Sequence, residues 1–338
     1  MYHVRFQGTH YEAGFRWGTL LFERGNKILD KVPFPVTPER MAFARACVPV
    51  YEAYYPEILE EIQGLADGQQ SDAGVLQAVL FSMYAMPPAC QCSCFAAVSE
   101  GEILMGRNSD FLTALERMNM NVIYRLTDGT HPFTGNTTAF VEMEDGVNGY
   151  GLAVGLTAVS PRRRKPGLNA GLLLRYFLEK CKTTSEVLAA VRRLPVASAQ
   201  TFTVADASGE IAVIECDAGQ VCAAETLHAE KRFVCATNAF HLPGMRAESG
   251  AAVDDWFAEE RYQTLITALS AREEGVDAAF AKRLLSGGYG FLCQYDRAEG
   301  RDTVWSVVYD LKRRRIERCE GNPGRRDYRE DARFSFPG

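Results

Sequence analysis

The sequence contains three cysteines at alternate positions, Cys90, Cys92 and Cys94, within the stretch PPACQCSCFAAVSEGEILMGRNSDF. Alternate residues of a β-strand point to the same face, so the three thiols are expected to lie side by side. A thiolate is both a nucleophile and a metal ligand. Arg107 and Asp110 follow where the partner strand of a hairpin would return toward the cysteines. The stretch therefore points to a thiol active site, a metal site or a tightly packed cluster of buried thiols.

A structural zinc site is the least favoured of these readings. Zinc sites typically use Cys-x2-Cys or wider spacing and need a fourth ligand. The nearest histidines in sequence, His3, His10 and His131, form no ligand pattern with the cysteines. We therefore expect no metal.

A catalytic thiol needs a group that accepts its proton. One arrangement pairs the cysteine with a histidine, for which His228 and His241 are the candidates. The other uses the α-amino group of the nucleophile itself, which is freed when the preceding peptide bond is cut. The pKa of an α-amino group is about 7.7–8.0, close to working pH, so it can take up and return a proton. N-terminal threonine enzymes use the same device. The residues alone leave both bases open.

The segment CSCFAAVSEGEILMGRNSDF, beginning at Cys92, resembles the start of the mature chain in the N-terminal-nucleophile (Ntn) hydrolases. More narrowly, it resembles the family of acyl-coenzyme A:6-aminopenicillanic acid acyltransferase, which is related to the choloylglycine hydrolases. That family's pattern is Cys-[Ser/Thr]-x-[Phe/Tyr], a hairpin, and then Gly-[Arg/Gln]-Asn-x-Asp-[Phe/Trp]. Further stretches resemble the family in the same order along most of the chain: HYEAGFRWG, EDGVNGYGLAVGLT, LLLRYFLEKCKTTSEVLAAVRRLP, TFTVADASGEIAVIE, CATNAF, EERYQTL and SVVYDLKRRRIERCEGNP.

The resemblance implies that Cys92 is the nucleophile. The chain would cut itself between Gln91 and Cys92, so that Cys92 carries both the thiolate and the free amine. Cys90 would lie before the cut, and Cys94 stands at a variable position of the family pattern. We therefore expect Cys90 and Cys94 to be packing residues.

The resemblance also implies roles for residues distant in sequence. Arg107 would stabilise the thiolate, as a nearby cation does, and Asp110 would hold the α-amino group. Asn238 would donate its side-chain amide to the oxyanion. Thr157 stands where choloylglycine hydrolases usually have Asn, which leaves its backbone N–H for the oxyanion hole. Arg261 matches a family arginine on the following helix and would brace the site.

The periodicity of the chain indicates the elements that must position these residues. Helical spacing dominates the first ninety residues, with a helix N-cap at Asp72, until Pro87-Pro88 stops the helix. Strands are then expected at 92–98, 102–106, 120–126, 138–143 and 151–158, followed by helices at 168–180 and 183–194, the second with a Thr183/Glu186 capping box. A four-stranded meander follows at 202–206, 211–216, 221–225 and 233–237, then helices at 254–269 and 277–285 and strands at 303–310 and 315–319.

This order favours an α+β fold, a four-layer α/β/β/α antiparallel sandwich with a helical N-terminal segment, which the resemblance identifies as the Ntn-hydrolase fold. We expect residues 1–91 to form a helical pro-segment, or α-subunit, and residues 92–338 the catalytic domain, packed together as one unit.

Composition narrows the class of protein. The 338 residues are 47% hydrophobic and 24% charged, with a net charge of −6, which argues against nucleic acid as the main partner. No run of residues approaches the roughly 18 apolar positions of a membrane span, and the first residues lack the pattern of a secretory signal. The ten cysteines are then expected to be reduced thiols in a cytoplasmic protein.

Together these observations predict an autoprocessing cysteine amidohydrolase or acyltransferase that acts on a linear, non-peptide C–N amide through a thioester on Cys92. The expected partner is a small-molecule amide or acyl substrate. No cofactor is expected, although a coenzyme A thioester remains open as the acyl donor, as does a homo-oligomer. Two alternatives stay open: an uncleaved, non-catalytic binding protein of the same fold, and a Cys–His thiol hydrolase that uses His241 or His228.

Overall fold

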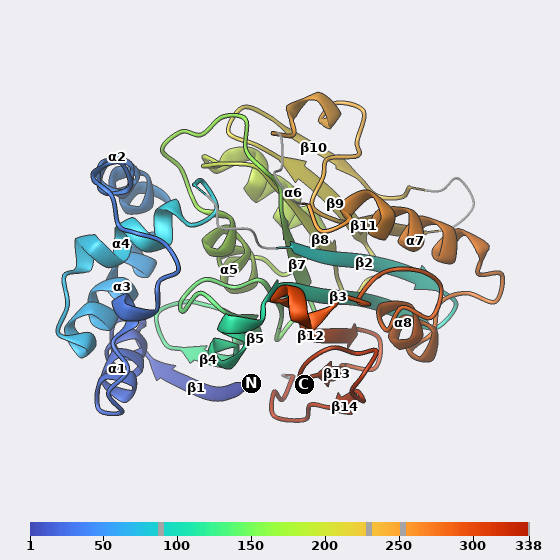
Figure 1. Cartoon of the computed structure of the whole chain (residues 1–338), viewed down its shortest axis with the longest axis horizontal. Coiled ribbons are helices and arrows are strands. Elements are labelled where there is room, and N and C mark those ends of the chain that lie inside the picture. Colours follow the sequence, from blue (N-terminus) through green and yellow to red (C-terminus); the bar gives the residue numbers. More distant parts are fainter. Residues whose placement is uncertain (87–90, 228–231, 251–254, 337–338) are drawn as a thin grey trace.

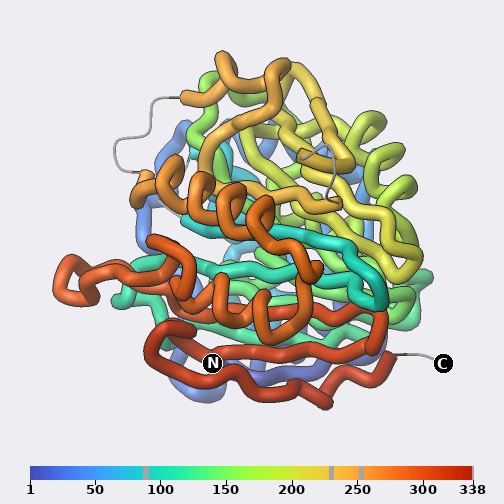
Figure 2. The backbone as a smooth tube through the Cα atoms, turned by 90° about the vertical axis from the view of Figure 1, so that its right-hand side faces the viewer, coloured from blue at the N-terminus to red at the C-terminus, as the bar shows by residue number. Residues whose placement is uncertain are grey.

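The computed structural model describes residues 1–86, 91–227, 232–250 and 255–336. Within these residues two β-sheets face one another and helices cover both outer faces (Figure 1). Helices α5 (Ala170–Lys180) and α6 (Thr184–Arg193) lie against the larger sheet, whereas α7 (Ala258–Ala271) and α8 (Ala278–Leu285) lie against the smaller one. Figure 2 shows α7 and α8 in front of the strands that they cover. The expected four-layer α/β/β/α sandwich is confirmed.

The larger sheet has eight described strands and is antiparallel except at one edge, where its first strand runs parallel to its neighbour. In spatial order the strands are β1 (Tyr2–Gly8), β4 (Met120–Leu126), β5 (Phe133–Thr137), β6 (Asp145–Asn148), β7 (Ala153–Ala158), β8 (Gln200–Ala205), β9 (Ile211–Cys216) and β10 (Val221–Ala224).

The smaller sheet has six described strands, all antiparallel: β11 (Phe233–Ala236), β2 (Gln91–Ser99), β3 (Glu102–Leu112), β12 (Arg301–Asp310), β13 (Arg315–Cys319) and β14 (Arg329–Glu330). The expected hairpin is its centre, formed by β2 and β3 with a tight turn at Gly101, whose φ of 77° suits glycine. Alternate side chains of this hairpin point between the two sheets, which is where a buried site can form.

Four helices of the N-terminal segment gather at one end of the molecule, on the left of Figure 1: α1 (His10–Phe22), α2 (Pro38–Tyr54), α3 (Pro56–Gln69) and α4 (Ala73–Ser82). Asp72 caps α4 as expected, because its carboxylate accepts a hydrogen bond from the backbone N–H of Val75 at 2.9 Å. Thr183 caps α6, but Glu186 reaches the N–H of Lys182 rather than that of Thr183, so the predicted capping box is only half formed.

Three expectations about the elements were wrong. The N-terminal segment is not wholly helical, because β1 adds a parallel strand to β4 and buries Phe6 against Trp17, with the two ring centroids 5.1 Å apart. Residues 138–143 form a connection between β5 and β6, where Phe140 adopts a positive φ of 57° that no strand allows. The expected fourth strand of the meander, β11, pairs with β2 in the smaller sheet instead of with β10. The expected start of helix α7 at Asp254 lies outside the described residues, and the helix begins at Ala258.

A buried network of charges joins the N-terminal helices to the rest of the fold. The guanidinium of Arg175 on α5 pairs with Glu61 of α3 and with Glu179, and all three side chains are fully buried. His10 of α1 lies 3.2 Å from Glu179, and the hydroxyl of Tyr55 donates to the same carboxylate at 2.5 Å. Each buried charge therefore has a partner, which is the condition for burying it at all.

The pKa values of the network show its preferred charge state. Burial lowers the pKa of His10, but the charge and hydrogen bond of Glu179 outweigh burial and raise it from 6.5 to about 9. Burial raises the pKa of Glu179, but the charges of Arg175 and His10 reverse this and lower it from 4.5 to about 2. The folded protein thus holds His10 as a cation and Glu179 as an anion.

We predict that stability falls with rising pH through this pair. Because the folded pKa of His10 lies above its ordinary value, its contribution is complete below pH 6.5 and is lost as pH rises through about 9. Denaturant unfolding across this range should therefore show a decline that His10→Gln reduces. His3→Gln, at the exposed His3–Glu320 pair, is the control and should keep the decline. Equal pH dependence in wild type and His10→Gln would contradict the assignment.

Candidate active site

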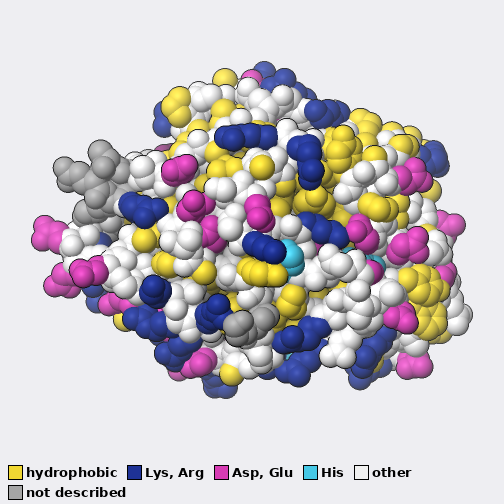
Figure 3. Space-filling model, turned by 180° about the vertical axis from the view of Figure 1, so that it is seen from behind, with side chains coloured by type: hydrophobic (Ala, Val, Ile, Leu, Met, Phe, Trp, Pro, Cys, Tyr) yellow, Lys and Arg dark blue, Asp and Glu magenta, His cyan; other side chains and the backbone are white. Residues whose placement is uncertain are grey.

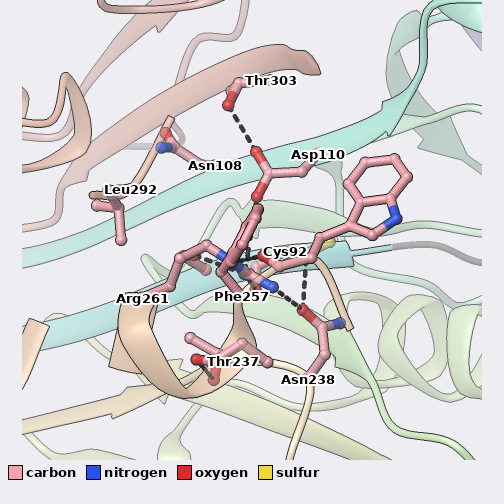
Figure 4. Close-up of polar contacts among 12 residues, drawn as sticks. Cys92, Asn108, Asp110, Thr237, Asn238, Phe257, Arg261, Leu292 and Thr303 are labelled. Carbon is pink, nitrogen blue, oxygen red and sulfur yellow. Dashed lines mark hydrogen bonds and ion pairs between the residues drawn. The ribbon is translucent and has the colours of Figure 1, made fainter. Parts of the chain in front are cut away.

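The β2–β3 hairpin brings the predicted nucleophile and its partners into register. Cys92 lies opposite Ser109, and Gln91 lies opposite Asp110. Cys92 is 1% exposed and Asp110 is fully buried. Figure 4 shows Cys92, Asp110, Asn238 and Arg261 converging on one point between the strands. The structure therefore brings together residues from β2 and β3, from the segment after β11 and from α7.

Arg107 contacts the sulfur of Cys92 directly. Its Nη2 donates to Cys92 Sγ at 2.7 Å, and the whole guanidinium is buried. The same group donates through Nη1 to Asp145 Oδ2 at 2.8 Å and through Nε to the carbonyl oxygen of Leu156 at 3.0 Å. Glu144 lies 3.4 Å from Nη2. Because all three nitrogens of the guanidinium donate hydrogen bonds, the cation is held in one position, beside the thiol of Cys92.

Arg107 stays protonated although its side chain is buried. Burial lowers the pKa of Arg107, but the charges of Cys92, Asp145 and Glu144 outweigh burial and raise the pKa above its ordinary value. Asp145 is itself fixed by Trp305 Nε1 at 2.9 Å and by the hydroxyl of Tyr309 at 2.7 Å. A permanent cation beside a sulfur atom favours the thiolate, which is the reactive form.

Asp110 lies on β3 of the hairpin, but its carboxylate contacts other residues than the amine of Cys92. Thr303 Oγ1 donates to one carboxylate oxygen at 2.6 Å, and the hydroxyl of Tyr295 donates to the other at 3.0 Å. Arg261 Nη1 is 3.7 Å from that second oxygen. Burial raises the pKa of Asp110, and the charge of Arg261 and the two hydrogen bonds offset only part of this effect.

Asn238 and Arg261 hold the backbone of Cys92. The Oδ1 atom of Asn238 accepts the N–H of Cys92 at 2.8 Å, while its Nδ2 donates to the carbonyl oxygen of Ala158 at 2.8 Å. Arg261 Nη1 donates to the carbonyl oxygen of Cys92 at 2.6 Å and to Ser93 Oγ at 2.9 Å, and its Nη2 donates to Asn238 Oδ1 at 3.0 Å. Arg261 therefore braces both the backbone of Cys92 and the side chain of Asn238.

Thr157 lies buried in β7, opposite Thr201. Its hydroxyl donates to the carbonyl oxygen of Thr237 at 2.6 Å and contacts the hydroxyl of Thr201. The side chain of Thr157 thus ties β7 to the residue that precedes Asn238. Its backbone N–H as an oxyanion donor stays a prediction.

The other cysteines and histidines are placed as follows. Burial raises the pKa of Cys94 to about 12, so this thiol is held neutral at the sheet interface. Cys90 and His228 lie outside the described residues. The ring of His241 is 3.1 Å from Glu259 and stacks on Tyr262 with centroids 3.4 Å apart. Among the described histidines none hydrogen-bonds Cys92.

Sequence reasoning missed the residues that orient the site. Asp145 and Glu144 were seen only as part of the stretch EDGVNGYGLAVGLT, although two adjacent acids entering a buried strand are a signal that a cation must face them. Tyr295 and Thr303, which hold Asp110, carried no signal, because hydroxyl side chains are common and their partner is almost two hundred residues away.

Three further features of the described residues concern metal binding, membrane spans and surface charge. In that part of the chain no group of three or more His, Cys, Asp and Glu side chains could hold a metal ion. No described helix is both long and apolar enough to cross a membrane. On the face drawn in Figure 3, lysines and arginines are interspersed with acidic side chains rather than forming a field of one sign.

We predict that Arg107→Gln slows alkylation of Cys92. The variant removes the cation that donates to the sulfur at 2.7 Å, so the rate with iodoacetamide near neutral pH should fall about tenfold or more. Peptide mass spectrometry gives the rate at each cysteine, with the half-buried Cys222 as internal reference. Arg192→Gln, on the exposed face of α6, is the matched control and should leave the rate unchanged. A rate in Arg107→Gln equal to that of wild type would show that the cation does not activate the sulfur.

Comparisons with known proteins bear on the fold and the family of this chain. A search of curated proteins found no match. Among solved structures, a mutant conjugated bile acid hydrolase from Clostridium perfringens aligns with a TM-score of 0.52 and 12% identity over 73% of this chain and 94% of its own, which shows the Ntn-hydrolase fold.

Two further structures are similar at lower TM-scores. An ortholog of N-acylethanolamine-hydrolyzing acid amidase from Caenorhabditis elegans aligns at 0.48 with 20% identity, over 65% of this chain and 93% of its own. Penicillin V acylase from Agrobacterium tumefaciens aligns at 0.42 with 18% identity, over 68% and 83%.

The sequence profile of one family, described as acyl-coenzyme A:6-aminopenicillanic acid acyl-transferase, matches residues 98–325. That match begins at residue 98, near the end of β2, and takes in Arg107, Asp110, Asn238 and Arg261. Since it spans well over half of the chain, the protein belongs to the acyl-coenzyme A:6-aminopenicillanic acid acyl-transferase family of Ntn hydrolases.

Proposed function

We propose that the protein is an autoprocessing cysteine amidohydrolase or acyltransferase that acts on a linear, non-peptide C–N amide through a thioester on Cys92. The observation that carries the proposal is that both reactive atoms of one residue are held by side chains. Arg107 Nη2 lies 2.7 Å from the sulfur of Cys92, and Asn238 Oδ1 lies 2.8 Å from its nitrogen. Membership of an acyl-transfer family supports the same chemistry.

The first reaction is the cut that frees the amine. The thiolate of Cys92 attacks the carbonyl carbon of Gln91, and the C–N bond to Cys92 breaks as its nitrogen takes up a proton. Gln91 is then held as a thioester on the sulfur. Water hydrolyses that thioester and releases the carboxylate of Gln91, which gives fragments 1–91 and 92–338. Asn238, which already accepts the N–H of Cys92, is placed to hold the new amine.

The second reaction uses the free amine as the base. The amine takes the proton of the thiol, the sulfur attacks the substrate carbonyl, and the amine returns the proton to the leaving nitrogen. The acyl group stays on Cys92 as a thioester until water or an amine accepts it. The Nδ2 of Asn238 donates to the carbonyl oxygen of Ala158 in the uncut chain. To donate to an oxyanion, the Asn238 amide must exchange the carbonyl oxygen of Ala158 for the substrate oxygen.

Asp110 acts in this scheme through its position. Its carboxylate is fixed by Tyr295 and Thr303 and lies 3.7 Å from Arg261, which in turn holds the backbone of Cys92. No cofactor is needed in either reaction, because the base, the nucleophile and the cation all belong to the chain. A coenzyme A thioester would enter as an acyl donor, with the same sulfur as acceptor.

We predict that the purified protein consists of two fragments, 1–91 and 92–338, and that Cys92→Ala yields one uncut chain. Intact-mass measurement under denaturing conditions separates these results. Cys94→Ala, which removes the neighbouring buried thiol, is the control and should still be cut. An uncut wild-type chain would support the non-catalytic binding protein instead, and a cut Cys92→Ala chain would remove Cys92 from the reaction.

A second prediction separates the two possible bases. His241→Gln should keep hydrolysis of acyl 4-nitroanilides within a small factor, since its ring faces Glu259 and Tyr262. Asn238→Ala should lower kcat by roughly 10²–10³, the usual effect of losing one oxyanion donor. Circular dichroism confirms folding of both variants. Abolished turnover in His241→Gln, with turnover kept in Asn238→Ala, would favour a Cys–His enzyme.

A further inference from the structure

A long apolar groove runs between the N-terminal segment and the catalytic half of the chain. Its volume is about 670 Å³, which is within the range of about 300–1,000 Å³ typical of small-molecule sites. Residues of β1, α1 and the following turn line one side, and the other side is lined by Ala114, Leu115, Arg117, Met118 and Met120. In Figure 1 this is the lower left region, where β1 and α1 lie beside β4.

The floor of the groove contains an unused hydrogen-bond donor. Trp17 lines the groove and is fully buried, and its indole N–H has no acceptor among the described residues. An unpaired buried N–H is unfavourable, because burial removes its water and nothing replaces it. The other floor residues, including Leu20, Leu21 and Ile28, offer no acceptor in their side chains. This donor lies beneath the floor, because its nitrogen is closed to solvent.

The rim of the groove is cationic. Arg24, Lys27, Lys31 and Arg117 line it, and all four side chains are exposed. None of the four forms an ion pair within the described residues. Among the lining residues the single acid is Asp30. The rim therefore carries a net positive charge that the fold does not neutralise.

The groove continues inward into a narrow apolar pocket of about 40 Å³. The two cavities share Lys31, Leu115, Met118, Thr138 and Phe140 as lining residues. Phe140 has the positive φ of 57° that places its ring there, a backbone conformation that is unfavourable for an aromatic residue. Strain of this kind is maintained where the surrounding structure gains from it. The narrow inner end suits an unbranched alkyl chain rather than a polar group.

We propose that this groove binds one molecule of an anionic amphiphile, with the alkyl chain along the apolar floor and the acidic head group at the cationic rim. A carboxylate or sulfate monoester head supplies the negative charge that the rim lacks, and the alkyl chain matches the apolar floor. This site is separate from the chemistry at Cys92 and stands whether or not the proposed reaction occurs.

The test is isothermal titration calorimetry of the Cys92→Ala protein with dodecanoate below its micellar concentration, so that no ligand is turned over. One site is expected, together with a rise in Tm, because a ligand that binds the native state stabilises it. Dodecanol should bind at least tenfold more weakly, and dodecyltrimethylammonium should not bind. Equal binding of all three amphiphiles would overturn the proposal, since the rim charge would then have no role.

Variants locate the ligand. Lys27→Glu/Arg117→Glu reverses the rim and should weaken dodecanoate binding at least tenfold. Arg16→Glu/Lys312→Glu makes the same change in net charge at exposed positions outside the groove lining and should not. If the control pair weakens binding as much as the rim pair, the effect is general electrostatics and the site is refuted.

A membrane surface is a different source of anionic lipid. The protein should not sediment with vesicles of phosphatidylglycerol more than with vesicles of phosphatidylcholine, because the groove takes up one amphiphile molecule from solution and does not dock on a bilayer. Sedimentation with the anionic vesicles in the absence of dodecanoate binding would replace the proposal with a membrane contact.

Discussion

The contact between the guanidinium of Arg107 and the sulfur of Cys92 is the interaction on which the rest of the site depends. A buried cation is tolerated only when it is fully paired, and each partner of Arg107 comes from a different part of the sandwich. Asp145 begins β6 and Leu156 lies on β7, both in the larger sheet, while Arg107 and Cys92 belong to the smaller one. The site therefore exists only when the two sheets face one another in this register.

Local pattern predicted the proximity of the residues that lie on one hairpin, whereas their roles came from the resemblance. Cys92, Arg107 and Asp110 fall on neighbouring strands joined by a short turn, so their spacing in sequence fixes their spacing in space. The roles of Asn238 and Arg261 came only through resemblance, because more than a hundred residues separate them from Cys92. Asp145, Tyr295 and Thr303 were missed for the same physical reason, since contacts across the two sheets leave no period in the sequence.

The fold shows the same division between local and distant information. The helices of the N-terminal segment and the strands β8 to β11 were predicted because periodicity of 3.6 or 2 repeats within a short window, but the placing of β11 in the other sheet was not. The strand β1 was missed because it is short, half exposed and stabilised by parallel pairing with β4, more than a hundred residues later. The segment 138–143 was mistaken for a strand because its apolar residues line a cavity rather than a sheet face.

The packing of the N-terminal segment also bears on the consequences of a cut after Gln91. Residues 1–91 contribute β1 to the larger sheet and share the buried Arg175–Glu61 and His10–Glu179 pairs with the rest of the fold. Separating the segment would expose an unpaired strand edge and leave Arg175 buried without Glu61, an arrangement that typically costs several kcal/mol. One broken peptide bond changes none of these contacts. A cut chain should therefore keep both halves together, and the groove between β1, α1 and residues 114–118 should survive the cut unchanged.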